Sequence, residues 1–194
     1  MTAVRAHPAF LTVAIFSLSL VSCSNATDTA KSELSADKWK ESQSRSPMGD
    51  AVTYVLSLEA ESSVPVVPKL VIACSTGNLR LYINTQTPLS QDPEYTEIGW
   101  YSVGRYRFGQ EQPQTVSWET STDHEAIFVP KITVDGSNMQ HQFALEFLDR
   151  IAAAQILHFE YNPLNGDRTV AEFDVRGLAG HLIHLKTQCP YPGP

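Results

Sequence analysis

Apolar and polar side chains alternate along much of the chain. From residue 52 to residue 60 apolar side chains recur at every second position, and the same alternation appears over residues 70–74 and 79–83. Because successive side chains of a strand point to opposite faces, this period of two predicts strands that each bury one face. The last two segments are separated by Thr76-Gly77-Asn78, a turn sequence typical of a β-hairpin.

Further short strands and two helices complete the predicted fold. Strands are indicated at residues 99–108, 115–119, 126–129, 155–161 and 169–175, with turn residues between them. Apolar stripes with helical spacing predict helices over residues 143–153 and 178–186. Short strands at regular intervals favour two packed sheets or a closed sheet. We therefore predict a mostly β fold, a β-sandwich or distorted barrel with two short helices and some α+β character.

The N-terminus has the pattern of an export signal. Arg5 precedes an apolar run over residues 10–20, which is too short for a spanning helix. The run ends in Leu20-Val21-Ser22-Cys23, where small residues precede a cysteine, as in a bacterial lipoprotein signal. We expect residues 1–22 to be removed and the Cys23 thiol to carry a lipid. The alternative is ordinary secretory cleavage after Ala26.

The segment after Cys23 predicts how the protein is held. Residues 23–37 are rich in small and polar residues and have one large apolar residue, Leu34, so we expect a flexible tether. Residues 38–194 are then long enough for a single domain. Ser24, rather than Asp, follows the cysteine, which favours lipid anchoring in the outer membrane, facing the periplasm; a soluble periplasmic protein is the alternative.

Charge and cysteine content narrow the class of protein. The chain has 21 Asp and Glu against 14 Lys and Arg, and no basic run follows the signal, which argues against binding to nucleic acid. With Cys23 assigned to lipid, Cys74 and Cys189 remain as a pair in an oxidising compartment. We expect them to form a disulfide, the alternative being two buried thiols.

The predicted strand at residues 99–108 has one face suited to binding. Alternation places Tyr101, Val103, Arg105 and Arg107 on one side, and we take Tyr101, Arg105 and Arg107 as candidate partner-binding residues. The alternative is that both arginines pair with acidic residues on neighbouring strands.

The opposite face of this strand is expected to be core. It carries Trp100, Gly104, Tyr106 and Phe108. A different interpretation is that Trp100, Tyr106 and Trp118 line an apolar pocket open at one end of the sandwich. Trp39, at the end of the tether, is expected to pack onto the domain.

Two groups of polar residues could carry chemistry. His181 and His184 lie three apart on the second predicted helix, a spacing that can hold a metal, but they flank its apolar stripe and have no cysteine nearby. Ser121, Asp123 and His124 contain the atoms of a hydrolase triad, yet residues this close in sequence do not readily converge. We predict no metal site, no cofactor and no catalytic residue.

The order of several motifs resembles the TagO/VasI-like family over residues 38–190. The motifs are Trp39 with Ser46-Pro47-Met48-Gly49-Asp50, the strand at 53–59, Pro68 to Cys74, Arg105-Tyr106-Arg107-Phe108, Trp118 with Ser121 and Asp123, and residues 173–189. Gly49 and Gly109 stand where the family pattern has acidic residues, so no acidic ligand site is carried over. Members are exported bacterial proteins, many encoded as accessories of type VI secretion systems.

The resemblance implies a non-enzymatic envelope accessory and supports the bridge between Cys74 and Cys189. We therefore expect a lipoprotein that binds an envelope or secretion-system protein. The alternatives are a small-ligand-binding envelope module, and an enzyme acting on the cell wall through His181, His184, Asp123 and His124.

Overall fold

The chain divides into two units, residues 1–33 and 34–194. The computed structural model describes residues 38–45, 51–61, 66–76, 78–91, 100–128 and 139–190, all within the second unit. The predicted signal at 1–22, the tether at 23–37 and the lipidation site Cys23 lie outside the described residues and stay predictions, as does the motif at 46–50.

The described part of the chain is mostly β with two helices, as the alternation predicts. Its strands are β1 (Lys40–Arg45), β2 (Val52–Glu59), β3 (Lys69–Ser75), β4 (Asn78–Asn84), β5 (Tyr101–Phe108), β6 (Gln114–Glu119), β7 (Ala126–Phe128), β8 (Ile156–Tyr161) and β9 (Thr169–Asp174). Its helices are α1 (Met139–Ala153) and α2 (Leu178–Gln188). The first helix begins four residues earlier than the sequence indicates.

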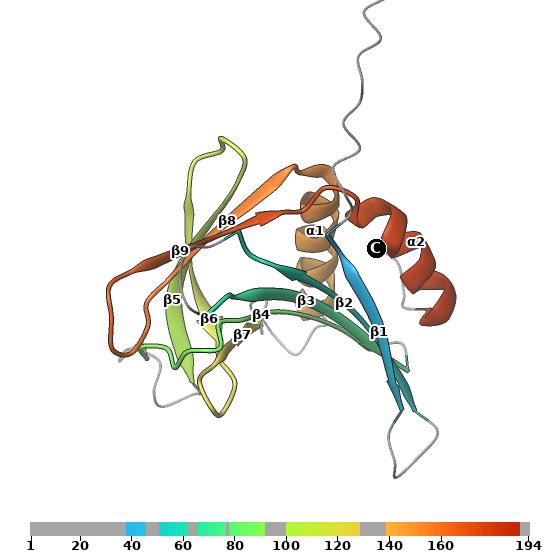
Figure 1. Cartoon of the computed structure of the whole chain (residues 1–194), viewed down its shortest axis with the longest axis horizontal. Helices are drawn as coiled ribbons and strands as arrows, with labels where there is room; N and C mark the ends of the chain where they lie inside the picture. Colours follow the sequence, from blue (N-terminus) through green and yellow to red (C-terminus); the bar gives the residue numbers. More distant parts are fainter. Residues whose placement is uncertain are drawn as a thin grey trace, which may run out of the picture. The chain divides into compact units, whose positions relative to one another are not determined.

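The strands form two antiparallel sheets (Figure 1). One has the order β1-β2-β3-β4-β7 and the other the order β6-β5-β8-β9. Isolated bridges link them, one from Thr120 after β6 to Ile127 on β7 and one from Glu61 after β2 to Glu172 on β9. The predicted hairpin is confirmed, since Ser75 at the end of β3 pairs with Asn78 at the start of β4.

β1 is a strand that the alternation does not predict. Its residues, Lys40–Arg45, are all polar or charged and all exposed. The strand exists because its backbone pairs with β2, from Lys40 opposite Ser57 to Arg45 opposite Val52. An edge strand of this kind leaves no apolar signature, and its charges discourage pairing with other chains.

A single apolar core fills the space between the sheets and the helices. Leu58 and Ile72 enter it from the first sheet, and Phe159 and Phe173 enter it from the second. In α1, Phe147 lies against the rings of Tyr106, Phe108 and Trp118, with ring centroids 5.0, 5.4 and 5.9 Å away. The predicted apolar stripe of α2 is confirmed, because Leu178, Leu182 and Leu185 are all buried.

The two ends of the described domain are fixed to its middle. Cys74 on β3 and Cys189 after α2 form the expected disulfide, with their Cα atoms 6.1 Å apart. Trp39 packs on the domain as expected and is 6% exposed. The bridge therefore joins α2 to a central strand of the first sheet.

Candidate functional site

The candidate binding residues lie on the outer face of the second sheet. Along β5 buried and half-buried side chains alternate, which confirms that Arg105 and Arg107 share the outer face while Tyr106 and Phe108 point into the core. Gly104 on the inner face leaves room for Trp118, whose ring lies 3.1 Å from the place a Cβ would occupy. The strand therefore holds its two arginines on a rigid, well-packed base.

The register of β5, β8 and β9 gathers further polar groups around these arginines. Arg105 lies opposite Glu160 and Arg107 opposite His158 on β8. Across the next pairing, Glu160 lies opposite Val170 on β9. Together they surround a hollow of about 170 Å³, lined by Arg105, Tyr106, Arg107, Pro113, His158, Glu160 and Val170.

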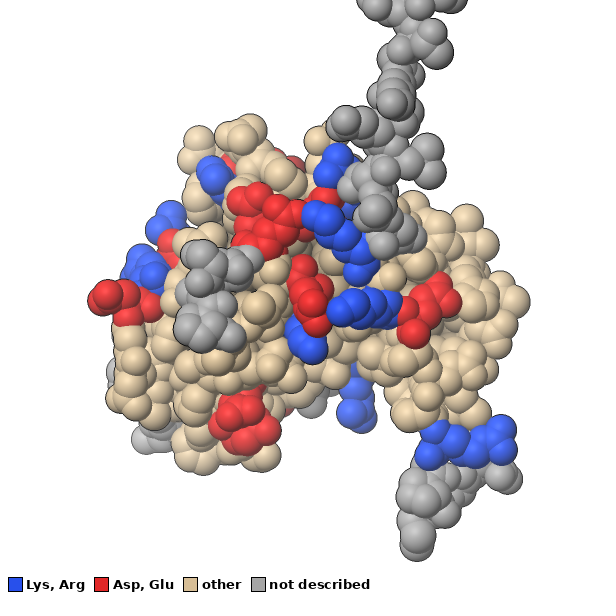
Figure 2. All heavy atoms as spheres, in the orientation of Figure 1, with Lys and Arg blue, Asp and Glu red and all other residues tan. Residues whose placement is uncertain are grey.

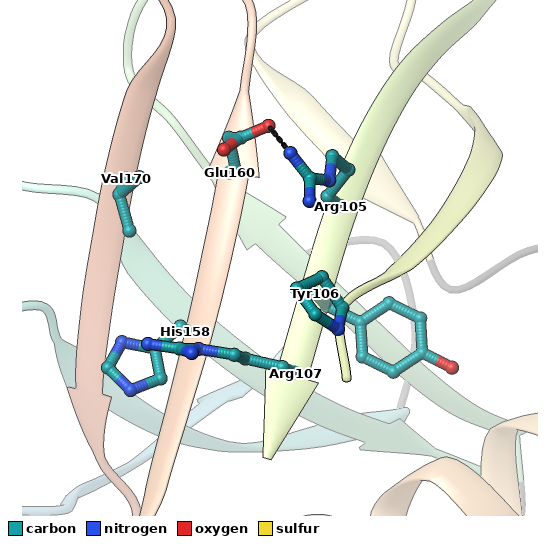
Figure 3. A pocket seen from close by; sticks show the side chains of 7 residues that line it. Arg105, Tyr106, Arg107, His158, Glu160 and Val170 are labelled. Carbon is teal, nitrogen blue, oxygen red and sulfur yellow. Dashed lines mark ion pairs between the residues drawn. The ribbon is translucent and has the colours of Figure 1, made fainter. Parts of the chain in front are cut away.

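The charges in this hollow are unequally paired (Figure 3). The Glu160 carboxylate lies 3.5 Å from Arg105 and 3.2 Å from Arg168, so two cations share one acid. His158 Nδ1 lies 3.3 Å from a Glu172 oxygen. Arg107 makes no ion pair with any residue that the structure describes, and its side chain extends across β8 toward His158.

The structure places two of the three predicted partner-binding residues in the hollow and the third outside it. Arg105 and Arg107 line the hollow, whereas Tyr101 lies at the opposite end of β5 and pairs through its backbone with Glu119 on β6. The alternative prediction, pairing with an acid on a neighbouring strand, holds for Arg105 and not for Arg107. Sequence reasoning missed His158, Glu160 and Val170, because only the strand order and register place them beside β5. It also missed Pro113, which lies in the connection between β5 and β6.

The placement of Trp100 on the core face is wrong. Trp100 is 50% exposed and its ring lies against His124, with centroids 5.0 Å apart. It precedes the first residue of β5, so the alternation of that strand does not extend to it. Tyr106 and Trp118 instead pack against each other in the core, and the three aromatic residues do not share one pocket.

A second polar cluster joins α2 to β1. His181 and His184 both lie against the Glu41 carboxylate, with Nδ1–oxygen distances of 2.5 and 2.9 Å, each to a different oxygen. The hydrogen bond with His181, followed by that with His184, holds the pKa of Glu41 below its ordinary value of 4.5. The helical spacing of the two histidines thus lets both of them contact one carboxylate, on a strand that the sequence did not predict.

A groove of about 310 Å³ runs beside this cluster. Its lining comprises Glu41, Ser42, Gln43, Tyr54, Val55, Leu56, His184, Leu185 and Gln188. Glu41 and Gln43 lie opposite Leu56 and Tyr54 in the register of β1 and β2. The groove therefore combines an apolar floor with amide, imidazole and carboxylate groups.

Ser121, Asp123 and His124 form a turn. The Ser121 hydroxyl donates to Asp123 Oδ1, which also accepts the Glu125 backbone N–H at 3.1 Å. The Ser121 hydroxyl also accepts the Ala126 backbone N–H at 3.0 Å. The hydrogen bonds from the Ser121 hydroxyl, the main cause, and from the Glu125 backbone N–H lower the pKa of Asp123. Within this trio the Ser121 hydroxyl donates to the aspartate, and His124 meets Ser121 through its backbone N–H, which donates to the Ser121 carbonyl at 2.9 Å.

Asp174 is a buried carboxylate with strong partners. Arg176 donates two hydrogen bonds to it, at 2.6 and 2.5 Å, and Lys38 Nζ lies 3.4 Å away. The hydrogen bonds from Arg176 lower the pKa of Asp174 from 3.8 to about 2, against the opposing effect of its burial at 6% exposure. Lys38 also pairs with Glu61, so this network ties the start of the domain to the ends of β2 and β9.

Acidic and basic side chains are intermingled on the face seen in Figure 2. Within the described ranges, no group of three or more His, Cys, Asp and Glu side chains is arranged to hold a metal ion. None of the described helices combines the length and the apolar character needed to cross a membrane. No family model, curated protein or solved structure matches the chain.

Proposed function

We propose that this chain is an exported binding protein of the bacterial envelope, anchored through a lipid on Cys23. It acts without catalysis, as an accessory factor of a type VI secretion system. The observation that carries the proposal is Arg107, a cation without an ion-pair partner among the described residues, in a hollow of the second sheet. A half-buried cation on a rigid sheet is ready to bind an anionic group, because no internal ion pair has to be broken first.

The compartment supports the same proposal. A disulfide between Cys74 and Cys189 suits a protein that folds outside the reducing cytoplasm. The apolar run that ends in Leu20-Val21-Ser22-Cys23 supplies a route for export and lipid attachment. A segment of small and polar residues after the cysteine would let the domain reach a partner at a distance from the bilayer.

The lipid anchor is tested by metabolic labelling and fractionation. Labelled fatty acid should enter the wild-type chain, and the Cys23→Ala variant should appear in the soluble periplasmic fraction. Two or three acyl chains hold a protein stably because each buried methylene contributes about 0.8 kcal/mol. If Cys23→Ala fractionates with membranes as the wild type does, or no label enters the wild type, simple secretion replaces the anchor.

The accessory role is tested in the native bacterium. A photo-crosslinking residue at Val170, on the rim of the hollow, should capture a component of the secretion machine that mass spectrometry identifies. The matched control is the same residue at Ile183 on α2, which is 72% exposed and lies outside the hollow. Deletion of the gene should reduce release of the tube protein into the medium, and unchanged release would contradict the proposal.

A small-ligand-binding module is the second candidate, favoured by the groove beside α2. Native mass spectrometry of the full chain, isolated without denaturation, would then show a bound small molecule. The matched variant is Gln43→Ala with Gln188→Ala, which removes two amide groups from the lining. A mass equal to that of the processed chain alone would leave the first proposal as the stronger one.

A further inference from the structure

The hollow on β5, β8 and β9 carries local positive charge on an acidic chain. Arg105, Arg107 and Arg168 contribute three guanidinium groups, and Glu160 is the acid that two of them share. His158 is already engaged by Glu172. The whole chain has a formal net charge of -7, so an acidic ligand is repelled over much of the surface and attracted here.

The spacing of the arginines matches an extended peptide. Arg105 and Arg107 are two residues apart on β5 and point to the same face, which places their backbone positions about 7 Å apart. An extended peptide repeats its side chains on one face with the same spacing. Two carboxylates at alternate positions of such a peptide can therefore each meet one guanidinium group, in the two-pronged geometry that arginine favours.

Apolar surface lies beside these charges. Val170 is 53% exposed, and both Val170 and Pro113 line the hollow. A peptide can cover them with aliphatic side chains, and its backbone N–H groups can donate to Glu160. An extended peptide holds its carboxylates at a fixed spacing and offers backbone N–H groups beside them, which a layer of anionic lipid headgroups does not, so a peptide is the better match.

We infer that the hollow binds an extended acidic segment of the partner protein, with Asp or Glu at alternate positions and aliphatic residues at its flanks. This inference rests on the proposed function, because it names the chemistry of the partner at the same site. Arg107 would donate to the first carboxylate, and Arg105 would donate to the second while Arg168 retains Glu160. The specificity then comes from the spacing of the carboxylates as well as from their charge.

The test uses the full chain, purified in detergent, and three labelled peptides in a fluorescence anisotropy titration. The first is Val-Ser-Glu-Ser-Glu-Ser-Val, with both carboxylates on one face when extended. The second, Val-Ser-Glu-Glu-Ser-Ser-Val, has the same composition and charge but turns its carboxylates to opposite faces. The third replaces both Glu residues of the first with Gln.

We expect the alternating peptide to bind at least about fivefold more tightly than either control, because it alone can engage both arginines. Arg107→Gln should weaken its binding by about fivefold to tenfold. Arg80→Gln, which removes an exposed arginine from β4 on the other sheet, is the matched control and should leave the affinity unchanged. Equal binding of the alternating and adjacent peptides, or binding that Arg107→Gln does not change, overturns the inference.

Two further outcomes separate this inference from the proposed function. If the alternating peptide fails to bind while crosslinking from Val170 to a secretion component still depends on Arg107, the ligand chemistry is wrong and the function stands. If that crosslink is also absent, the inference and the proposed function are both wrong. Phosphatidylglycerol added to the detergent micelles is the last competitor. If it displaces the peptide from the wild type but not from Arg107→Gln, the hollow binds a lipid headgroup and the inference of a peptide ligand is overturned.

Discussion

The α2–β1 cluster and the hollow on the second sheet both combine basic and acidic groups, yet they are paired differently. In the α2–β1 cluster the carboxylate of Glu41 has an imidazole on each of its oxygens. In the hollow Glu160 is shared by Arg105 and Arg168, and Arg107 has no ion-pair partner among the described residues. We interpret the completely paired cluster as one that stabilises the fold, and the hollow with its excess cation as the proposed binding surface.

The two regions also differ in how the surrounding backbone is held. Cys189 directly follows α2 and its disulfide fixes the helix end to β3, and β1 lies beside α2 at the edge of the first sheet (Figure 1). The hollow lies over the middle of the second sheet, on β5 and β8, with no helix assigned to its lining. If paired charges are structural and unpaired charges bind ligand, substitutions in the α2–β1 cluster should alter the free energy of unfolding. Substitutions in the hollow should alter the affinity for the ligand.

Removal of the disulfide should have the largest effect on stability. Cys74 and Cys189 are 115 residues apart in sequence, and in the chain-entropy model a loop of this length contributes about 4 to 5 kcal/mol. Cys74→Ala with Cys189→Ala should therefore lower the free energy of unfolding by about that amount, measured by urea denaturation. Binding of the alternating acidic peptide should be retained wherever the variant is still folded.

Alkylation provides the check on this prediction. Both sulfurs are buried and bonded, so an alkylating reagent should label neither in the unreduced protein and both after unfolding with a reductant. Two free thiols in the unreduced chain would contradict the disulfide. The wild type treated with reductant should show the same loss of stability as the double variant.

The network at Asp174 should give the next largest effect. Its pKa is about 2, below the ordinary 3.8, so ionised Asp174 stabilises the fold above about pH 4 and this contribution is lost as the pH falls toward 2. The shift corresponds to about 2 kcal/mol. Asp174→Asn should lower the free energy of unfolding at pH 7 by a similar amount and flatten its pH dependence between pH 4 and pH 2.

The matched control for this change is Asp149→Asn, an exposed acid on α1. It should alter the free energy of unfolding by less than about 0.5 kcal/mol. Equal effects of the two substitutions would show that Arg176 and Lys38 do not stabilise Asp174, and pairing would then no longer distinguish structural charges.

Glu41→Gln should have a smaller effect, because the α2–β1 cluster is partly exposed to water. We expect a loss of about 1 kcal/mol at pH 7, since two charge-assisted hydrogen bonds become neutral ones. The lowered pKa of Glu41 means that its contribution is present above pH 4.5 and is lost as the pH falls below that value. A double-mutant cycle with His184→Ala measures the coupling directly.

The same variant tests the comparison between the two regions. Glu41→Gln should leave the affinity of the hollow for the acidic peptide unchanged. A change in affinity would show that α2 and β1 take part in binding, and the separation between structural and binding charges would fail.

Much of the fold could be predicted because its signals are local. The alternation in β2, β3 and β5 and the apolar stripes of the helices require only neighbouring residues to be read together. β1 could not be found in this way, because a fully exposed strand is selected by its pairing with β2 and not by its own apolar pattern. Trp100 was misplaced because alternation does not reveal where a strand begins.

The site was predictable only in part for the same reason. The face that carries Arg105 and Arg107 follows from the alternation within one strand. The presence of Glu160 beside Arg105, and of His158 beside Arg107, depends on β8 pairing with β5 in one register, although some 50 residues separate them in sequence. The convergence of His181 and His184 on Glu41 likewise depends on how α2 meets an unpredicted strand.

Replacement of the hollow's arginines should have the smallest effect on stability and the clearest effect on binding. Arg105→Ala with Arg107→Ala removes one exposed ion pair at 3.5 Å and one cation that has no ion-pair partner among the described residues. The free energy of unfolding should therefore change by less than about 0.5 kcal/mol, as for most surface substitutions, while binding of the alternating peptide is lost. Thermal denaturation and anisotropy on the same sample measure both quantities. Loss of folded structure in the double variant would show that these arginines hold the second sheet together, and a stable variant with unchanged affinity would show that the excess charge has no ligand.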